Sequence, residues 1–462
     1  MRSERMRWLV LVVGMLAMIA GSTFQFGLAY LIPAFRDEGL TLEQAGLLVA
    51  CPTAGVMLTL IAWGAAADRW GERIVLSTGL GLAGVFLLAA RLAHGTVGLA
   101  VWLALAGAAG ASVLASGRLI LGWFALHERA LAMGIRQSAQ PMGLALAAAT
   151  LPALAGGGTD VPLVFLAVLF FVAATTAFAL VRDPAPVPPA AGGKPADGKP
   201  ADGRPGDGRP VAGRPGDGRS GDGRPGDGKS AAGKSGDRRP ADGRPAEHEP
   251  ISGTPYRTPT LWRIHAASAL LVIPQFTITT FALVFLTDTR GWSALAAGHL
   301  LAGAQVCGAL SRLGAGYWSD RTGSRLNPMR IIAVTTGAGM LTLAAAAAAG
   351  SGLAVPVLLF LGVVAVSSNG LSFTAVAEYA GSAWAGRALG IQTTGQNVLT
   401  AATPPVLAMT IGAAGFAPSF AVVAAFPLIA ALLVPVASEQ TETGAAPGES
   451  EPANETAPVH RS

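Results

Sequence analysis

The sequence predicts an all-α membrane protein whose twelve transmembrane helices form two pseudo-symmetric six-helix bundles. Three observations support this fold class: an apolar composition, recurring long apolar runs and an internal repeat. The chain is 52% hydrophobic and only 13% charged, whereas a soluble chain carries about 25% charged residues. Runs of about 18 apolar residues or more, which are long enough to cross a bilayer, recur from Trp8 to Ala437.

Short connections containing glycine, proline or charged residues separate the apolar runs. Each run is expected to be a helix, because lipid offers no hydrogen-bond partner to an open backbone. The lipid bilayer is therefore the first expected partner. The predicted spans are residues 8–34, 44–66, 74–92, 97–124, 131–154, 161–181, 262–286, 295–317, 330–350, 353–377, 387–411 and 416–437.

The arginines predict the orientation of these spans. With the N-terminus inside, the inner connections carry Arg2, Arg5, Arg7, Arg69, Arg73, Arg129, Arg321, Arg325, Arg330 and Arg387. The outer connections carry Arg36, Arg91 and Arg290. Because positive residues are retained on the cytoplasmic side, we expect a multi-pass protein of the cytoplasmic membrane with both termini in the cytoplasm.

A central segment of different composition divides the chain. The predicted domains are an N-terminal bundle (1–182), a disordered cytoplasmic linker (183–260), a C-terminal bundle (261–437) and a disordered cytoplasmic tail (438–462). The linker repeats pentads of the form Gly-Lys/Arg-Pro/Ser-Gly/Ala-Asp and has almost nothing to bury, which is typical of disorder. We interpret it as a passive spacer.

Two linker segments match the phosphate-binding pattern GxxxxGK[ST], namely residues 223–230 and 228–235. The pattern binds nucleotide only between a strand and a helix, and the pentad repeat generates both matches by itself. We therefore expect no nucleotide partner. Outside the linker, acidic and basic residues nearly balance, so the pI of 9.6 does not indicate a nucleic-acid partner.

The two halves resemble each other at nearly constant spacing. Ala45-Gly46 recurs as Ala297-Gly298 at an offset of 252 residues, and Gln25-Phe26 recurs as Gln275-Phe276 at 250. Gly134-Ile135 recurs as Gly390-Ile391, with Gln140 falling opposite Gln396. Matches at equivalent topological positions indicate an internal duplication, which in transporters places the substrate site at the interface of the repeats.

The most informative pair of repeats lies in two short loops. GAAADRWGER (64–73) follows the second span, and GYWSDRTGSR (316–325) follows the eighth at the same offset of 252. Together with twelve spans and a long central loop, these motifs resemble the signature loops of the major facilitator superfamily over about 430 residues. The resemblance implies a transporter without enzymatic activity, in which two bundles rock about a central site.

The loop residues are the expected gating residues. The resemblance places Asp68 near the start of helix 11, around Arg387, and Asp320 near the start of helix 5, around Ala130. A carboxylate near a helix N-terminus is stabilised by about 0.3–1 kcal/mol, so both would latch the cytoplasmic side; a charged turn that only anchors topology is the alternative. The predicted gating set is Gly64, Asp68, Arg69, Gly71, Arg73, Gly316, Asp320, Arg321, Gly323 and Arg325, with Arg118 and Arg312 as buried gate-stabilising arginines about 9 Å deep.

Polar residues in the spans predict the substrate site. Arg136 and Gln140 share one face of helix 5, as Gln392 and Gln396 share one face of helix 11. The predicted substrate-binding set is Arg136, Gln140, Gln392, Gln396, Asn397, Gln25 and Gln275. Hydrogen bonding that only joins helices is the alternative.

The composition of this site predicts the substrate. No carboxylate stands in the middle of a predicted span, so we expect a small organic or inorganic anion, moved alone, with a proton or against a counter-anion. The alternative is an efflux antiporter for drugs or other hydrophobic compounds, because Gly134–Gly143 is similar to the Gly-Pro motif of drug–proton antiporters. Gln140 replaces the glycine before proline in that motif. We expect no cofactor and no metal, since the histidines and cysteines are scattered.

Overall fold

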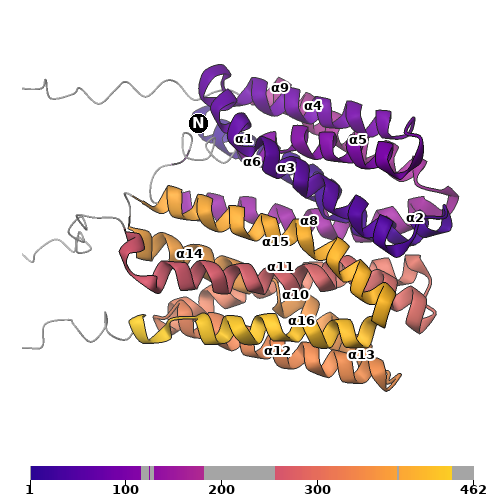
Figure 1. Ribbon diagram of the computed structural model, residues 1–462. Helices are drawn as coiled ribbons and strands as arrows, with labels where there is room; N and C mark the ends of the chain where they lie inside the picture. The colour runs from indigo at the N-terminus through magenta and orange to yellow at the C-terminus, as the bar shows by residue number, and fades with distance from the viewer. Residues whose placement is uncertain (1, 116–123, 125–128, 182–254, 382–383, 440–462) are drawn as a thin grey trace, which may run out of the picture. The chain divides into compact units, whose positions relative to one another are not determined.

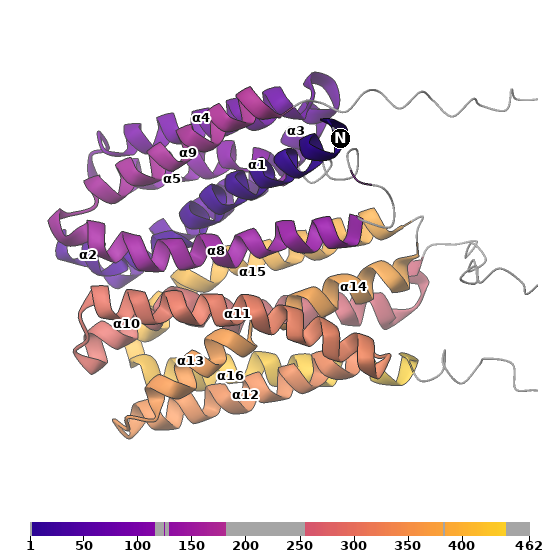
Figure 2. The ribbon, with the colours of Figure 1, turned by 180° about the vertical axis from the view of Figure 1, so that it is seen from behind.

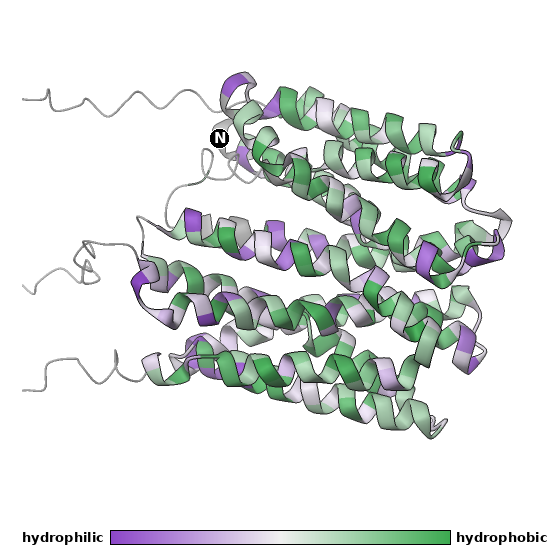
Figure 3. Ribbon diagram, in the orientation of Figure 1, coloured by the Kyte–Doolittle hydropathy of each residue, from purple (hydrophilic) through white to green (hydrophobic). Residues whose placement is uncertain are grey.

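The computed structural model describes residues 2–115, 124, 129–181, 255–381 and 384–439, and every regular element among them is a helix. Ten described helices are long and apolar enough to cross a membrane. Hydrophobic residues cover most of each helix, and hydrophilic residues gather near the helix ends (Figure 3). Most of the predicted linker, both phosphate-loop matches, most of the predicted tail and Arg118 lie outside the described residues.

The N-terminal half supplies the first group of helices in Figure 1. They are α1 (Arg2–Gln25), η1 (Gly27–Leu31), α2 (Ile32–Asp37), α3 (Leu42–Trp70), α4 (Glu72–Ala90), α5 (Gly95–Gly110), α6 (Ser112–Ala115), α8 (Arg129–Leu154), η2 (Ala155–Gly157) and α9 (Asp160–Leu180). Thr41 begins α3 with a capping box, in which its hydroxyl accepts the Gln44 N–H and the Gln44 side chain accepts the Thr41 N–H.

The C-terminal half repeats this order. Its helices are η3 (Pro255–Arg257), α10 (Pro259–Arg290), α11 (Ala294–Thr322), α12 (Leu326–Ala348), α13 (Ala354–Val364), α14 (Ser368–Ala380), α15 (Ala385–Ala414) and α16 (Phe416–Leu433). The element η3 and the first two residues of α10 fall within the stretch predicted as linker.

Three predicted spans are not continuous α-helices. The first changes to a 3-10 helix after Gln25, the fourth is interrupted at Ala111, and the tenth is interrupted at residues 365–367. Hydropathy over each whole span predicted single helices, although a polar residue stands at or beside each break, namely Gln25, Ser112 and Ser367. The fourth and tenth spans are equivalent in the two halves, and their breaks lie at equivalent positions.

The internal duplication extends to the packing. In the N-terminal half α4 packs on α9 and α1 on α8; in the C-terminal half α12 packs on α16 and α10 on α15. Figures 1 and 2 show these helices running side by side. Helices α3 and α11 then carry the contact between the halves, with α3 against α15 and α8 against α11.

We call the end of the helices that holds residues 64–73 and 316–325 the motif end, and the other end the opposite end. At the opposite end the halves touch closely. A Cβ placed on Gly46 would lie 2.7 Å from the Ala408 Cβ, and one on Gly298 would lie 2.4 Å from the Ala148 carbonyl oxygen. Only glycine permits helices to approach this closely.

Toward the motif end the same faces of α3 and α11 lose their partners. On α3 the exposed stripe is Ala54, Leu58, Ile61 and Ala65; on α11 it is Val306, Leu310, Leu313 and Tyr317. Each residue of one stripe is the repeat equivalent of a residue of the other at the offset of 252. Leu58 is 83% exposed and Leu310 63%. The halves therefore meet at the opposite end and part toward the motif end.

Candidate functional site

Two arginines lie against the interrupted helices. The Arg136 Nη2 donates to the Val113 carbonyl at 3.1 Å, beside the break in the fourth span. The Arg312 Nε donates to the Val366 carbonyl at 3.1 Å, within the break in the tenth span. Each guanidinium thus donates to a backbone carbonyl at or beside an equivalent break, at a depth where lipid supplies no hydrogen-bond donor.

The two arginines differ in their other contacts. Arg136 is buried, and the nearby carboxylate of Glu72, also buried, acts on it electrostatically. The Arg312 Nη1 reaches across the two halves to the Gln140 Oε1 at 3.5 Å. In the described part of the chain Arg312 forms no ion pair. Gln140 lies one helical turn from Arg136, so both arginines border the contact between α8 and α11.

Helix α11 is longer than the sequence predicted. Helix α11 was expected to end near residue 317, but it continues through the second signature loop to Thr322. Arg312 lies ten residues, or about 15 Å, from the end of the helix, and the added turns belong to the charged signature loop. The end is set by Gly323, whose φ of 62° is left-handed.

The predicted glutamines divide between the halves. Gln392 and Gln396 come together through two serines: Gln392 Nε2 donates to Ser372 Oγ at 3.1 Å, and Gln396 Nε2 donates to Ser268 Oγ at 2.7 Å. The two serine hydroxyls are 3.1 Å apart. These four side chains are buried where α10, α14 and α15 meet.

Of the other predicted residues, Gln275 is linked to that group through Asn369, whose carbonyl oxygen accepts from the Ser372 hydroxyl at 3.0 Å. Gln25 Nε2 donates to Thr53 at 3.3 Å, and Gln275 accepts from Asn369 at 3.0 Å. Asn397 is half-buried on α15. Among the described contacts, no hydrogen bond joins Gln25, Gln275 or Gln396 to the pair Gln140 and Arg312.

The first signature loop turns sharply between α3 and α4. Gly71 has a φ of 80°, a left-handed conformation that favours glycine. Arg73 is held against α9, where its Nε donates to the Phe178 carbonyl at 2.7 Å. Arg69 is exposed beside the Trp70 ring. The Asp68 side chain lies outside the described part, so its expected contact near Arg387 stays a prediction.

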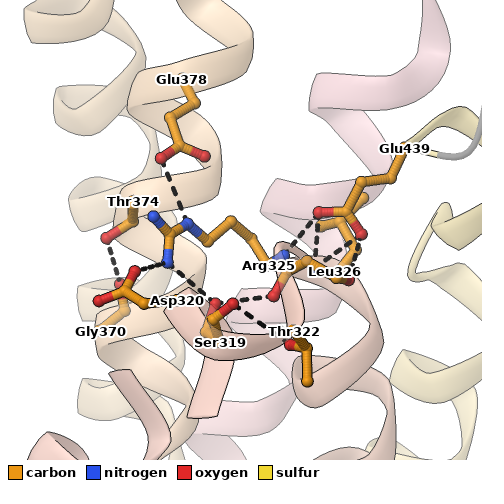
Figure 4. A network of polar contacts seen from close by, with 10 residues as sticks. Ser319, Asp320, Thr322, Arg325, Leu326, Gly370, Thr374, Glu378 and Glu439 are labelled. Carbon is orange, nitrogen blue, oxygen red and sulfur yellow. Dashed lines mark hydrogen bonds and ion pairs between the residues drawn. The ribbon is translucent and has the colours of Figure 1, made fainter. Parts of the chain in front are cut away.

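The second signature loop is a network of ion pairs and hydrogen bonds (Figure 4). Arg325 donates to Asp320 and, at 3.2 Å, to Glu378. Burial lowers the pKa of Arg325, but Asp320 and Glu378 outweigh it and raise that pKa overall. Glu439 accepts from the Arg325 N–H at 2.6 Å and from Leu326 at the start of α12. A carboxylate there is favoured by the helix dipole, so the loop is tied to α14 and to the chain beyond α16.

At the opposite end two pairs of repeat-equivalent residues meet. Arg36 of α2 forms an ion pair with Asp288 of α10, and the two positions are 252 residues apart. The rings of Phe26 and Phe276, equivalent at an offset of 250, have centroids 5.2 Å apart. Residues at equivalent positions touch where the pseudo-twofold axis passes between them. A pocket of about 640 Å³ opens beside the ion pair.

Comparison with known proteins agrees with this architecture. The family model described as Major Facilitator Superfamily matches residues 10–404 and 266–460. The chain belongs to the major facilitator superfamily. An uncharacterised MFS-type transporter of Mycobacterium tuberculosis (strain H37Rv) is 37% identical over 433 residues, which cover 93% of this chain and 85% of the relative. The protein is thus an MFS transporter and a multi-pass membrane protein, as the signature loops predicted.

Solved MFS structures share the fold at low identity. A bacterial homologue of the human lysosomal transporter Spinster, inward-facing and unoccupied, has a TM-score of 0.71 at 14% identity, covering 95% of this chain and 98% of its own. The D-xylose–proton symporter has a TM-score of 0.67 at 14% identity, covering 94% and 99%. A mutant form of the nucleoside transporter NupG has a TM-score of 0.61 at 11% identity, covering 92% and 98%.

Several polar residues of this MFS transporter were not predicted from its sequence. His265, Ser268 and Ser372 lie within predicted spans, and Glu72 lies within the first signature loop; nothing local indicates the partners of any of them. The pair Arg36 and Asp288 did leave a signal, because opposite charges stand at repeat-equivalent positions. A search for such charge pairs at the repeat offset would have found it.

Proposed function

We propose that this transporter moves a small organic or inorganic anion across the cytoplasmic membrane by alternating access, with its motif end and both termini in the cytoplasm. The arginine distribution supports this orientation. In it, the described state is closed toward the outside, where Arg36 pairs with Asp288, and open toward the cytoplasm, where the exposed stripes of α3 and α11 lie.

The observation that carries the proposal is the pair of equivalent helix breaks with an arginine against each. In transporters, discontinuous helices at corresponding positions of the two repeats mark the binding site. Here the guanidinium groups of Arg136 and Arg312 donate to the carbonyls of Val113, beside one break, and of Val366, within the other. Both donor groups border the contact between α8 and α11, where one half meets the other.

The charges around this site favour an anion. Two guanidinium groups face one carboxylate, that of Glu72, which acts on Arg136. Arg312 has neutral hydrogen-bond partners, Gln140 and the Val366 carbonyl. A guanidinium presents a planar fork that matches carboxylate or phosphate. We therefore propose both arginines, with Gln140, as the anion receptor, and infer that Arg312 contributes the larger share.

An anion bound here would couple transport to conformational change. A buried, unneutralised guanidinium is costly, so the empty carrier resists closing its motif end over Arg312. A bound anion offsets that charge and allows closure. The same electrostatics permit exchange against a counter-anion or movement with a proton.

Uptake by proteoliposomes tests the proposal. The purified chain is reconstituted and offered a panel of radiolabelled organic and inorganic anions, sugars and cationic dyes. Anion uptake is expected, and Arg312→Gln should lower it at least tenfold, with Arg312→Lys recovering little because lysine lacks the fork. Arg136→Lys and Arg136→Gln should lower it less. Arg263, which bonds only to the Leu432 and Leu433 carbonyls among its described contacts, supplies the matched control Arg263→Gln.

Efflux of hydrophobic compounds is the second candidate. It is favoured by the apolar stripes exposed at the motif end, which include Leu58, Ile61 and Leu313. In that case transport of the dyes should survive Arg312→Gln, while the stripe substitutions Leu58→Gln and Leu313→Gln should lower it. Anion uptake that is equal in wild type and both Arg312 variants would overturn the anion receptor.

A further inference from the structure

A histidine inside the C-terminal half is held at both ring nitrogens. His265 lies on α10 with 8% of its surface exposed. Its Nδ1 is 3.2 Å from the Gln392 Oε1, and its Nε2 is 3.1 Å from the Tyr256 hydroxyl. Gln392 leads on through Ser372 and Ser268 to Gln396, so the ring ends a hydrogen-bonded chain that includes two predicted substrate-binding glutamines.

This arrangement accommodates the ring with or without a second proton. The Gln392 amide donates to Ser372, which leaves its oxygen to accept from Nδ1–H. The neutral ring then accepts the Tyr256 hydroxyl proton at Nε2. After protonation Nε2 donates instead, and the tyrosine oxygen accepts, because a hydroxyl can do either. The ring therefore keeps the same two hydrogen-bond partners in both protonation states.

We propose that His265 is the proton-binding site of this transporter, and that its protonation draws the motif end of α15 toward α10 through Gln392. The inference rests on the proposed function, in which a proton accompanies the anion. A protonated ring donates a charge-assisted hydrogen bond, which is roughly twice as strong as a neutral one. Its positive charge, like that of Arg312, is offset when the anion binds, so proton and anion favour each other.

Among the residues that the structure describes, no fixed countercharge faces the ring. From η3 it faces Tyr256, whose pKa burial raises, so that this hydroxyl stays protonated near neutral pH. From α15 the ring faces Gln392. Farther along α15, Arg387 stacks on Trp384, whose ring contacts Tyr256. Charged residues elsewhere on the packed helices have described partners of their own: Arg263 with Leu433, and Glu378 with Arg325. Tyr379 of α14 is a further titratable group on these helices.

The other described histidines provide a contrast. His94 precedes α5 at the opposite end, and His299 is exposed on α11. Neither has a described hydrogen bond between its ring and another helix. His265 is the described histidine whose charge state acts directly on a helix that joins the two halves.

A solute-free pH titration of the whole chain tests this inference. Cysteines replace the exposed residues Trp70 and Asn327, one in each half at the motif end, in a Cys51→Ser/Cys307→Ser background. Their distance is followed by fluorescence energy transfer in liposomes between pH 5 and 9. The proton is the only ligand varied, so the result is independent of which anion the carrier takes. In the wild-type protein the distance between the two labels should change in a single titration step, and in His265→Asn this distance should stay constant across the pH range.

Two further variants keep the test decisive. Tyr256→Phe retains the histidine but removes the hydroxyl that accepts a hydrogen bond from the protonated Nε2. The protonated ring is then less stable, so the midpoint of the distance titration should move to lower pH. His299→Asn should titrate like wild type. A wild-type distance that ignores pH, an unchanged midpoint in Tyr256→Phe, or a normal titration in His265→Asn would each overturn the proton site. Failure of the anion proposal would instead show as absent anion uptake with the titration intact.

Discussion

The helices that join the two halves carry glycines at both ends, but only the glycines at the opposite end are in close contact with a neighbouring helix. At the opposite end Gly46 and Gly298 lie at contact distances that exclude any side chain. At the motif end Gly64, Gly316 and Gly390 have open space, with nothing within 4 Å of an added Cβ. Glycine costs stability in a helix by about 1 kcal/mol, and at the motif end no contact in this state offsets that cost.

This difference indicates what the unused glycines are for. Helices α3 and α15 run antiparallel, with Gly46 level with Ala408. Continuing that register brings Gly64 level with Gly390, at the motif end. The unfilled glycines are therefore placed for a close approach that this state does not make. We expect the state closed at the motif end to pack there as the present state packs at the opposite end.

The largest effect is expected from filling that gap. Gly64→Leu combined with Gly390→Leu should leave folding and detergent stability unchanged, because both positions are open. Closure at the motif end should cost about 1–3 kcal/mol for each overpacked side chain, which lowers turnover at least tenfold. Cysteine accessibility of the motif end should remain high under all conditions. Normal turnover would show that the halves close in another register.

The next largest difference is expected between two glycine-to-alanine variants, one at each end of α11. Gly298→Ala places a Cβ 2.4 Å from the Ala148 carbonyl oxygen, where backbone must move, whereas Gly316→Ala meets nothing. The first variant should weaken the α8–α11 contact by about 1–3 kcal/mol and expose the opposite end to labelling. Gly316→Ala should show the same cysteine labelling as the wild-type protein in this state. Equal labelling of the two variants would contradict the packing difference.

The helices and the repeat could be predicted because their signals are local. A bilayer requires long apolar runs, and the signature loops recur with their glycines at the positions where the chain turns, as at Gly71 and Gly323. The breaks at Ala111 and residues 365–367 left no such signal. The Val113 and Val366 carbonyls accept hydrogen bonds from Arg136 and Arg312 of other helices. The short polar residues at the breaks, such as Ser112 and Ser367, do not by themselves distinguish a break from a continuous span.

The candidate site was predicted in part for the same reason. Helical spacing placed Gln392 and Gln396 on one face, and they do share one network. Spacing could not identify the serines that join them, or the histidine beyond, because those contacts cross between helices.

Neutralising a charge at the motif end should have a moderate effect. Asp68→Asn keeps the side-chain shape and removes the charge expected to meet the start of α15 when the motif end closes. Losing about 1 kcal/mol there would move a balanced equilibrium roughly fivefold toward the motif-open state. Cysteine labelling from each side of the membrane measures this ratio. An unchanged ratio would reduce Asp68 to a charged turn that anchors topology.

The smallest effect, with the opposite sign, is expected at the axial ion pair. Arg36 and Asp288 join the halves only while the opposite end is closed, and their side chains are 40% and 34% exposed. Solvent screens such a pair, so it contributes about 0.2–1 kcal/mol. Asp288→Asn should therefore shift the labelling ratio toward the state that is open at the opposite end. The shift should be at most about fivefold, and larger in low salt than in high salt. The charge swap Arg36→Asp with Asp288→Arg should restore the wild-type ratio, because the two positions are equivalent in the repeat. If the swap behaves like the single variants, the pair is a surface contact and the aromatic pair Phe26 and Phe276 carries the closure.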